Sequence, residues 1–261
     1  MENCNSTCTP IMANTKLTLQ AEDERVDATL YKQIVGSLRY VCNSRPDISY
    51  GVGLISRYMG DPRQSHLSVA KHILRYLKGT ADYGLFYPKK HNEMNEVLEA
   101  WSDSDWSGDQ LDRKSTFGYV LKFMEATFSW CSKKQNIVAL SSCEAEYVAA
   151  SETACQCAWI EAMLDELMIN YCKPVKLMID NKSSISLARN PVAHGRSKHI
   201  ETQYHYLREQ VDKKKLDLLH CPTEDQATDI FTKALRQNRF QKLREHLGIR
   251  SFNSFTLGGV C

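Results

Sequence analysis

The sequence predicts an α/β fold in which a mixed five-stranded sheet carries flanking helices and is preceded by a small, mainly helical segment. Between residues 30 and 78, apolar residues recur at spacings of three and four, which is typical of helices. From residue 97 onward, five short apolar runs bounded by turn residues indicate strands, and the first three are consecutive. The last two strands are separated by helical patterns, so we expect helices packed on a mixed sheet.

The first part of the chain divides into a leader and a helical segment. Residues 1–27 are polar and lack sustained periodicity, so we expect a flexible leader. Residues 28–91 contain three helical patterns, and the first ends at Arg45-Pro46 because the residue before a proline avoids the helical conformation. The predicted helices cover residues 30–42, 48–59 and 67–77.

The predicted sheet and its helices lie within residues 92–236. A capping box formed by Ser141 and Glu144 opens a long helix that runs to about Met168. A second capping box, Thr223 with Gln226, opens a helix over residues 223–234. The other predicted elements are strands at 97–102, 118–124, 127–132, 173–180 and 215–221, helices at 182–189 and 199–211, and a C-terminal helix and tail at 237–261.

Composition indicates an intracellular protein that is neither secreted nor inserted in a membrane. No apolar run approaches the ~20 residues that a membrane span needs, and the N-terminus lacks the features of a signal peptide. The ten cysteines show no paired C-x-x-C spacing, which argues against a zinc site. The charge is unevenly distributed, because residues 28–91 carry ten Lys and Arg against three acids. This excess of seven positive charges would suit a nucleic-acid partner, although basic helices are often only solvated.

An acidic stretch follows the basic one immediately. Residues 92–112 contain seven acids and no Lys or Arg, and Asp103 and Asp105 stand at the end of the first predicted strand. Clustered carboxylates offer the oxygen ligands that a hard divalent cation prefers. A solvated acidic loop is the alternative. Both aspartates can face the same side of an extended strand, so the residues themselves do not choose between them.

Three further carboxylates are candidates for the same edge of the sheet. Glu146 begins the apolar stripe of the long helix, in steps of three and four, whereas Glu144 already serves the cap. Asp180 ends an apolar strand just before a helix, a common ligand position in open sheets. Asp229 lies one turn inside its predicted helix. Each has an ordinary alternative as an exposed acid, but four such carboxylates at one edge suffice to hold a pair of metal ions. The apolar positions of the stripe are Ala150, Thr153, Cys157, Ile160, Leu164 and Leu167.

Four stretches of residues 97–235 resemble the ribonuclease H domain of copia-type LTR retrotransposon Pol polyproteins. They are WSDSDWSGDQLDRKSTFGYV, SWCSKKQNIVALSSCEAEYVA, LMIDNKSSISLARNPVAHGRSKHIETQYHYLRE and PTEDQATDIFTKAL, in that order. Upstream, YKQIVGSLRYVCNSRPDISYGV and HILRYLKGT resemble the end of the reverse transcriptase of the same polyprotein, its thumb and connection part. The resemblance implies a C-terminal fragment of such a polyprotein, with a ribonuclease H-like fold after the helical segment.

The resemblance also implies an activity. It places the catalytic, metal-binding carboxylates at Asp103, Glu146, Asp180 and Asp229, and thereby chooses Asp103 over Asp105. The implied reaction is hydrolysis of the RNA strand of an RNA–DNA hybrid with two Mg²⁺ ions, for which Mn²⁺ can substitute. The upstream reverse transcriptase part is a further expected partner. Candidate phosphate contacts are Lys133, Lys134, Arg196 and Lys198, with plain surface charge as the alternative.

Some features depart from the family or leave its function open. The paired-aspartate strand of the polymerase is absent, so the chain has no polymerase active site of its own. A catalytically idle remnant that only binds nucleic acid is the alternative function, and an integrase-like nuclease is disfavoured by the order of the acids. His220, near the end of the last predicted strand, could assist proton transfer or product release, but a structural role is the more common one.

Overall fold

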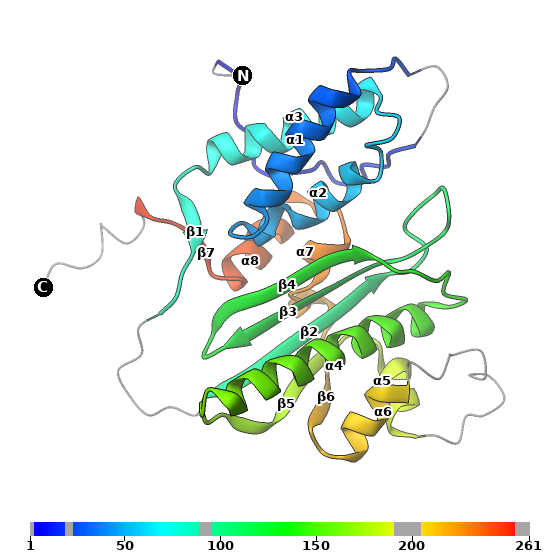
Figure 1. Ribbon diagram of the computed structural model, residues 1–261, viewed down its shortest axis with the longest axis vertical. Coiled ribbons are helices and arrows are strands. Elements are labelled where there is room, and N and C mark those ends of the chain that lie inside the picture. The colour runs from blue at the N-terminus through cyan, green and yellow to red at the C-terminus, as the bar shows by residue number, and fades with distance from the viewer. Residues whose placement is uncertain (1–2, 19–22, 89–95, 191–204, 254–261) are drawn as a thin grey trace, which may run out of the picture. The chain divides into compact units, whose positions relative to one another are not determined.

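The computed structural model describes residues 3–18, 23–88, 96–190 and 205–253 (Figure 1). The chain forms two compact units, which we call unit 1 (Met1–Tyr87 with Lys233–Cys261) and unit 2 (Pro88–Thr232). The C-terminal residues, expected as a separate helix and tail, therefore belong to the unit formed by the N-terminal residues. Within the described ranges, no helix combines the length and the apolar character needed to cross a bilayer.

Unit 1 is built on the three predicted helices. α1 (Ala28–Val41) begins where the Asp27 carboxylate accepts a hydrogen bond of 2.8 Å from the backbone N–H of Thr29. The second helix is preceded by one turn of 3₁₀ helix, η1 (Pro46–Ile48), because proline fits the first helical turn. α2 (Ser49–Ser56) and α3 (Gln64–Gly79) follow, and the apolar faces of the three helices pack on one another.

Residues 3–18 differ from the flexible leader expected here. Ile11 and Leu17 are buried, and the Tyr58 hydroxyl donates a hydrogen bond of 2.6 Å to the carbonyl of Leu17. The His72 ring lies 3.0 Å from the carbonyl oxygen of Thr9. Two isolated apolar residues thus anchor a segment that has no periodicity, and a search for periodicity does not detect such anchors.

The C-terminal part of unit 1 adds a helix and a strand. β1 (Tyr83–Leu85) pairs antiparallel with β7 (Ile249–Ser251), and α8 (Gln237–His246) precedes β7. Two short segments far apart in the sequence therefore lie side by side in one small sheet (Figure 1).

Unit 2 contains the predicted mixed sheet, whose strand order is β4-β3-β2-β5-β6. The predicted α/β class, with five strands and flanking helices, is confirmed. The first three strands form an antiparallel meander, and the last two run parallel to β2. The strands are β2 (Val97–Asp105), β3 (Thr116–Phe123), β4 (Ala126–Lys134), β5 (Cys172–Ile179) and β6 (Leu216–His220).

One face of this sheet is covered by α4 (Ser142–Glu166), which packs against β2, β3 and β5 (Figure 1). The predicted stripe from Glu146 to Leu164 is buried, but Leu167 lies just past the helix end and is exposed. Leu98 and Ala100 of β2 belong to the core beneath α4. α5 (Lys182–Arg189) and α6 (His205–Asp212) pack against α4 and β6.

The helix predicted over residues 223–234 is wrong. The chain forms a 3₁₀ turn, η3 (Thr223–Asp225), and a separate short helix, α7 (Asp229–Thr232), which packs against β2, β3 and β4. Gln226 between them has extended backbone and is fully buried, and its side-chain amide donates to the Ser102 carbonyl at 3.0 Å. The Gln226 side chain, which the capping-box pattern assigned to a helix start, therefore forms a tertiary hydrogen bond to β2 instead.

Candidate metal centre

Three of the predicted carboxylates meet in unit 2. Asp103, Glu146 and Asp180 each offer an oxygen atom, and these atoms all lie within 4.8 Å of one another. Asp103 and Glu146 are buried, and Asp180 is half-buried. Asp103 lies on β2, Glu146 lies in the second turn of α4, and Asp180 directly follows β5. An all-carboxylate set of this kind suits a hard divalent cation, because such ions prefer oxygen ligands.

Asp103 occupies a rigid position near the end of β2. Its backbone pairs with Gly118 of β3, and its side chain is 1% exposed. Side chains alternate between the faces of a strand, so Asp103 points away from the face that α4 covers. On that opposite side, the hydroxyl of Thr232 in α7 donates a hydrogen bond to Oδ2 of Asp103.

Glu146 reaches the same place from α4. The Ser141 hydroxyl caps this helix by accepting a hydrogen bond of 3.1 Å from the Glu144 N–H, and the Glu144 carboxylate accepts one of 2.7 Å from the Leu140 N–H. The cap therefore occupies Glu144 and leaves Glu146 to face the sheet, as predicted. Oε1 of Glu146 accepts a hydrogen bond of 3.1 Å from the backbone N–H of Ser104, which fixes its carboxylate beside β2.

The end of β5 allows carboxylates from the two faces of the sheet to meet. The parallel pairing of β2 with β5 ends at Ser102 and Ile179, while β2 continues to Asp105. Beyond that point β2 stays paired with β3 but has no partner strand on the β5 side, so Glu146 can bond to the β2 backbone there and approach Asp103. Asp180 follows the last paired residue of β5, and the Asn181 side chain caps α5 directly after it.

Asp229, the fourth predicted carboxylate, is not part of this cluster. It is buried at the start of α7, the helix whose last residue contacts Asp103. The structure thus places Asp229 on an element that touches the site, without bringing its oxygens into the group of three.

Asp105 has a different environment from Asp103. Its Oδ1 accepts a hydrogen bond from the backbone N–H of Thr116, and the chain packs closely on its carboxylate at Gly108. A Cβ atom added to Gly108 would lie 1.9 Å from Oδ2 of Asp105. These contacts hold the turn after β2, so the Asp105 carboxylate serves the turn and Asp103 joins the cluster.

Asp105→Asn is therefore expected to keep the metal-binding capacity of the chain. The amide oxygen of asparagine can still accept the Thr116 N–H bond, so the turn should survive. The measurement is titration of the variant with Mn²⁺, followed by electron paramagnetic resonance of the free ion. Loss of Mn²⁺ binding in a folded Asp105→Asn protein would contradict the assignment of Asp103.

The predicted phosphate contacts have unequal surroundings. Lys133 is exposed on β4, whereas the Lys134 ammonium lies 2.6 Å from Oδ2 of Asp109 and 2.8 Å from Oδ2 of Asp112. Arg196 and Lys198 lie outside the described residues. His220 is exposed at the end of β6 and pairs with Ile179, the residue before Asp180.

Sequence reasoning did not identify the residues that hold the carboxylates in place. Thr232 and Gln226 contact β2 at Asp103 and Ser102, and the Ser104 N–H contacts Glu146. The T-D-I-F-T run contained Thr232, but nothing in its local spacing indicates a contact with a strand 129 residues earlier.

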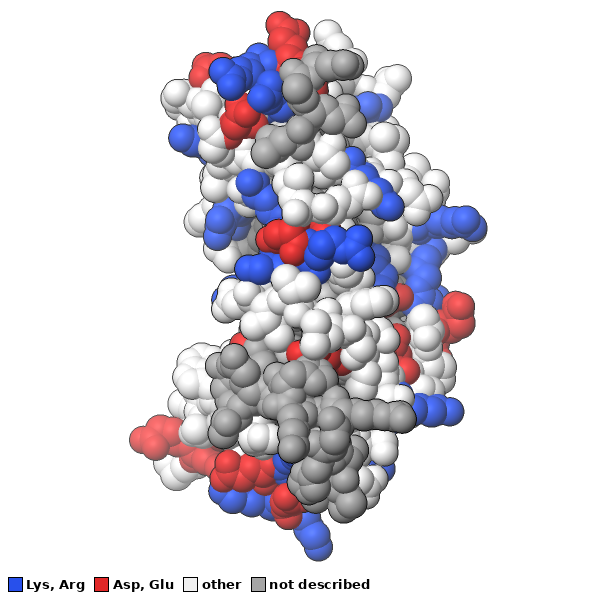
Figure 2. Space-filling model, turned by 90° about the vertical axis from the view of Figure 1, so that its right-hand side faces the viewer, with Lys and Arg blue, Asp and Glu red and all other residues white. Residues whose placement is uncertain are grey.

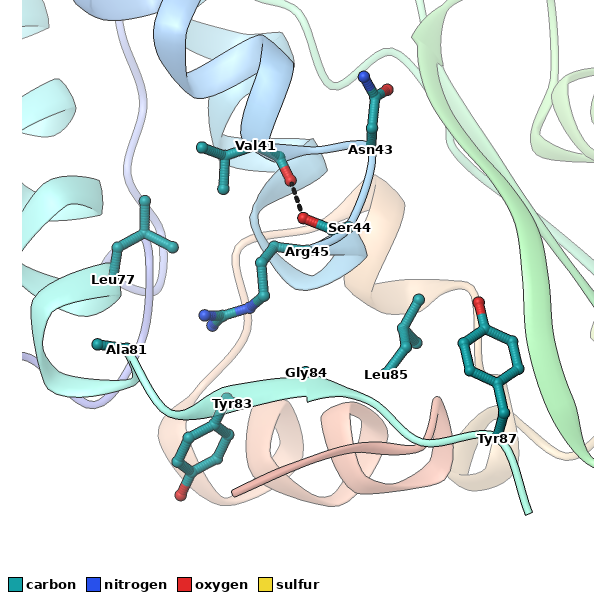
Figure 3. A pocket seen from close by; sticks show the side chains of 10 residues that line it. All are labelled: Val41, Asn43, Ser44, Arg45, Leu77, Ala81, Tyr83, Gly84, Leu85 and Tyr87. Atoms are coloured by element: carbon teal, nitrogen blue, oxygen red, sulfur yellow. Dashed lines mark hydrogen bonds between the residues drawn. The ribbon is translucent and has the colours of Figure 1, made fainter. Parts of the chain in front are cut away.

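A pocket of unit 1 contains none of the predicted site residues. It has a volume of about 580 Å³ and lies between the end of α1, the end of α3 and the strand β1 (Figure 3). The Arg45 side chain extends into the region between α1 and β1, and its guanidinium pairs with Asp47 at 2.8 Å. The positive charge beside this pocket is thereby balanced within unit 1.

The surface in Figure 2 shows how basic side chains are distributed. Blue Lys and Arg side chains are interspersed with white and red ones on this face.

Comparison with known proteins gives close relatives over almost the whole chain. It is 42% identical over 241 residues to the retrovirus-related Pol polyprotein from transposon RE1 of Arabidopsis thaliana, covering 92% of this chain. It is 37% identical over 259 residues to that of transposon TNT 1-94 of Nicotiana tabacum, covering 96% of this chain. The chain spans only 16% and 19% of the lengths of these two relatives. Half of the chain, 131 residues, is also 40% identical to 90% of the secreted RxLR effector protein 161 of Plasmopara viticola. No protein-family model matches the chain.

Solved structures similar to this chain include ribonucleases H1. That of Halobacterium salinarum aligns at a TM-score of 0.35 and 12% identity, covering 52% of this chain and 94% of its own. LC11-RNase H1, solved in complex with an RNA/DNA hybrid, aligns at 0.34 and 15%, covering 52% of this chain and 93% of its own. The fold of this chain is established by its own strand order and helices.

Proposed function

The chain belongs to the retrovirus-related Pol polyprotein family of transposons, and from that membership we propose that unit 2 is a ribonuclease H that hydrolyses the RNA strand of RNA–DNA hybrids. The observation that carries the proposal is the cluster of Asp103, Glu146 and Asp180, whose oxygens lie within 4.8 Å of one another. These are three of the four carboxylates that the resemblance to ribonuclease H domains selected, the fourth being Asp229.

The residues of the cluster fit a divalent cation. Three carboxylates held this close repel one another unless a cation offsets their charge, and their oxygens are the ligands that Mg²⁺ and Mn²⁺ prefer. We propose that they hold Mg²⁺, with Asp229 as a ligand of a second ion. When bound, such a pair of ions activates a water molecule and stabilises the leaving 3′ oxygen of a phosphodiester.

The protein's own contribution is to fix the carboxylates before the substrate arrives. Asp103 stands on a strand that is paired with β3, and Glu146 is tied to the Ser104 N–H. Neither carboxylate needs to reorganise, and sites on rigid elements hold productive geometry better than sites on loops. Selection of RNA would depend on contacts to its 2′-hydroxyl groups, which only the RNA strand carries.

The test is cleavage of an end-labelled RNA–DNA hybrid by the purified chain in Mg²⁺, with EDTA as the control and with the Asp229→Asn variant alongside. The proposal expects cutting of the RNA strand that EDTA abolishes and Asp229→Asn weakens. Salt-sensitive binding of the hybrid without cleavage at any Mg²⁺ or Mn²⁺ concentration would overturn it. That outcome would favour the idle nucleic-acid-binding remnant, to which the seven excess positive charges of residues 28–91 would contribute.

Two neighbouring lysines provide a further prediction. Lys133→Ala is expected to weaken hybrid binding, since the exposed Lys133 ammonium can reach a phosphate. The slope of the logarithm of affinity against the logarithm of salt concentration should become shallower by about one. Lys134→Ala is expected instead to lower thermal stability, because it leaves the buried Asp109 carboxylate without the ammonium 2.6 Å away. Fluorescence anisotropy with a labelled hybrid and thermal unfolding separate these effects. Equal affinity losses at constant stability in both variants would contradict the assignment.

A further inference from the structure

The buried hydroxyl of Thr232 connects α7 to the carboxylate cluster by a side-chain hydrogen bond. Thr232 is the last residue of α7 and is fully buried, and its Oγ1 donates to Oδ2 of Asp103. The methyl group of a threonine would be enough to fill space at this position. The hydroxyl adds a donor, whose nearer acceptor is Oδ2 of Asp103; the backbone carbonyl of Asp229, in the same helix, lies farther away at 3.4 Å.

The surrounding contacts keep this hydroxyl where it is. The segment before α7 is fastened to β2 by Gln226, which donates to the carbonyl of Ser102, and Thr228 donates to the Gln226 side chain at 2.8 Å. The segment is thus attached to two consecutive residues of β2, Ser102 through its carbonyl and Asp103 through its side chain. Opposite Asp103, Gly118 has no side chain, which allows α7 to lie directly on β3.

A hydrogen bond to one oxygen of a carboxylate restricts rotation of the whole group. The hydroxyl therefore restricts the orientation of the Asp103 carboxylate, and a donor to the charged form also stabilises that form. Residues that hold a metal ligand in this way commonly change metal affinity by ~10–100-fold when they are replaced.

We propose that Thr232 is a positioning residue for Asp103, holding its carboxylate in the orientation in which it meets Glu146 and Asp180. This inference deepens the proposed function, since it takes a divalent cation as the ligand of the cluster. A positioning role depends on the Thr232 hydroxyl, whereas a packing role would depend only on the shape of the side chain.

The experiment measures Mn²⁺ binding to the whole chain by electron paramagnetic resonance, independently of any cleavage. Thr232→Val keeps the shape and removes the donor, and it should weaken Mn²⁺ binding by about tenfold. Thr232→Ser restores the hydroxyl and should bind within about threefold of the parent. The matched control is Thr153→Val in α4, which removes an equally buried hydroxyl that bonds to the Ala149 carbonyl at 2.8 Å. It should lower thermal stability and leave Mn²⁺ affinity unchanged.

Several outcomes would overturn the inference. They are parental Mn²⁺ affinity in Thr232→Val, equal weakening in Thr232→Val and Thr232→Ser, or absence of Mn²⁺ binding in the parent. If Thr232→Val does not fold, Thr232→Ala provides the same comparison with a smaller side chain. Failure of the proposed function is a separate result: the parent would bind Mn²⁺ through Asp103 and still not cleave the hybrid, while the ranking of the Thr232 variants in Mn²⁺ affinity would stand.

Discussion

Asp103→Asn is expected to remove hybrid cleavage almost completely, by about 1,000-fold or more. Asp103 is the most deeply buried carboxylate of the cluster, at 1% exposed, and asparagine replaces its charge by a neutral amide. A metal ion contributes several kcal/mol of stabilisation to the charged transition state, and each 1.36 kcal/mol is a factor of ten in rate. The rate of RNA-strand cleavage in Mg²⁺ measures this loss, and Mn²⁺ titration reports whether the ion still binds.

Asparagine at this position is a conservative change for the fold. Its amide oxygen can still accept the hydrogen bond of the Thr232 hydroxyl, so the packing of α7 on β2 should be preserved. Asp105→Asn is the matched control, because it makes the same substitution two residues away on the same strand. Cleavage that survives in Asp103→Asn and in Asp180→Asn would disprove the proposed active site.

Gly118→Ala is expected to destabilise unit 2 by about 1–3 kcal/mol and to weaken Mn²⁺ binding at the same time. The added Cβ would lie 2.6 Å from Cβ of Phe231 and 3.2 Å from Cγ2 of Thr232. These atoms belong to α7, so the helix must move away from β3. Such a shift separates the Thr232 hydroxyl from Asp103, which is why one added methyl group should affect both stability and the metal site.

The measurements are thermal unfolding and Mn²⁺ affinity of the same preparation. Gly36→Ala is the control for the substitution itself, because Gly36 is exposed in α1 and an added Cβ would have no neighbour within 4 Å. That variant should gain up to about 1 kcal/mol, since alanine is the better helix former. If Gly118→Ala is as stable as the parent and binds Mn²⁺ equally well, the close approach of α7 is not needed for the site.

Local patterns in the sequence determined most of the secondary structure and offered the candidate carboxylates. The strand and helix periodicities predicted β2 to β6, and the cap at Ser141 assigned Glu144 to the helix start and left Glu146 for the sheet. This was possible because periodicity and capping depend on neighbouring residues. The resemblance to Pol polyproteins chose Asp103 over Asp105, which face the same side of the strand, and the curated relatives confirm that family.

Only the tertiary structure decided how these elements are held together. Ile11 and Leu17 anchor a segment with no periodicity, Gln226 interrupts a predicted helix to bond to Ser102, and β7 joins β1 from the far end of the chain. Each depends on a partner distant in sequence, and spacing along the chain carries no information about such partners. The meeting of Glu146 with Asp103 depends on where β5 ends beside β2, which is likewise a property of strand pairing. Local sequence offered the candidate carboxylates, whereas the contacts that orient Asp103 and Glu146 arise only when the chain folds.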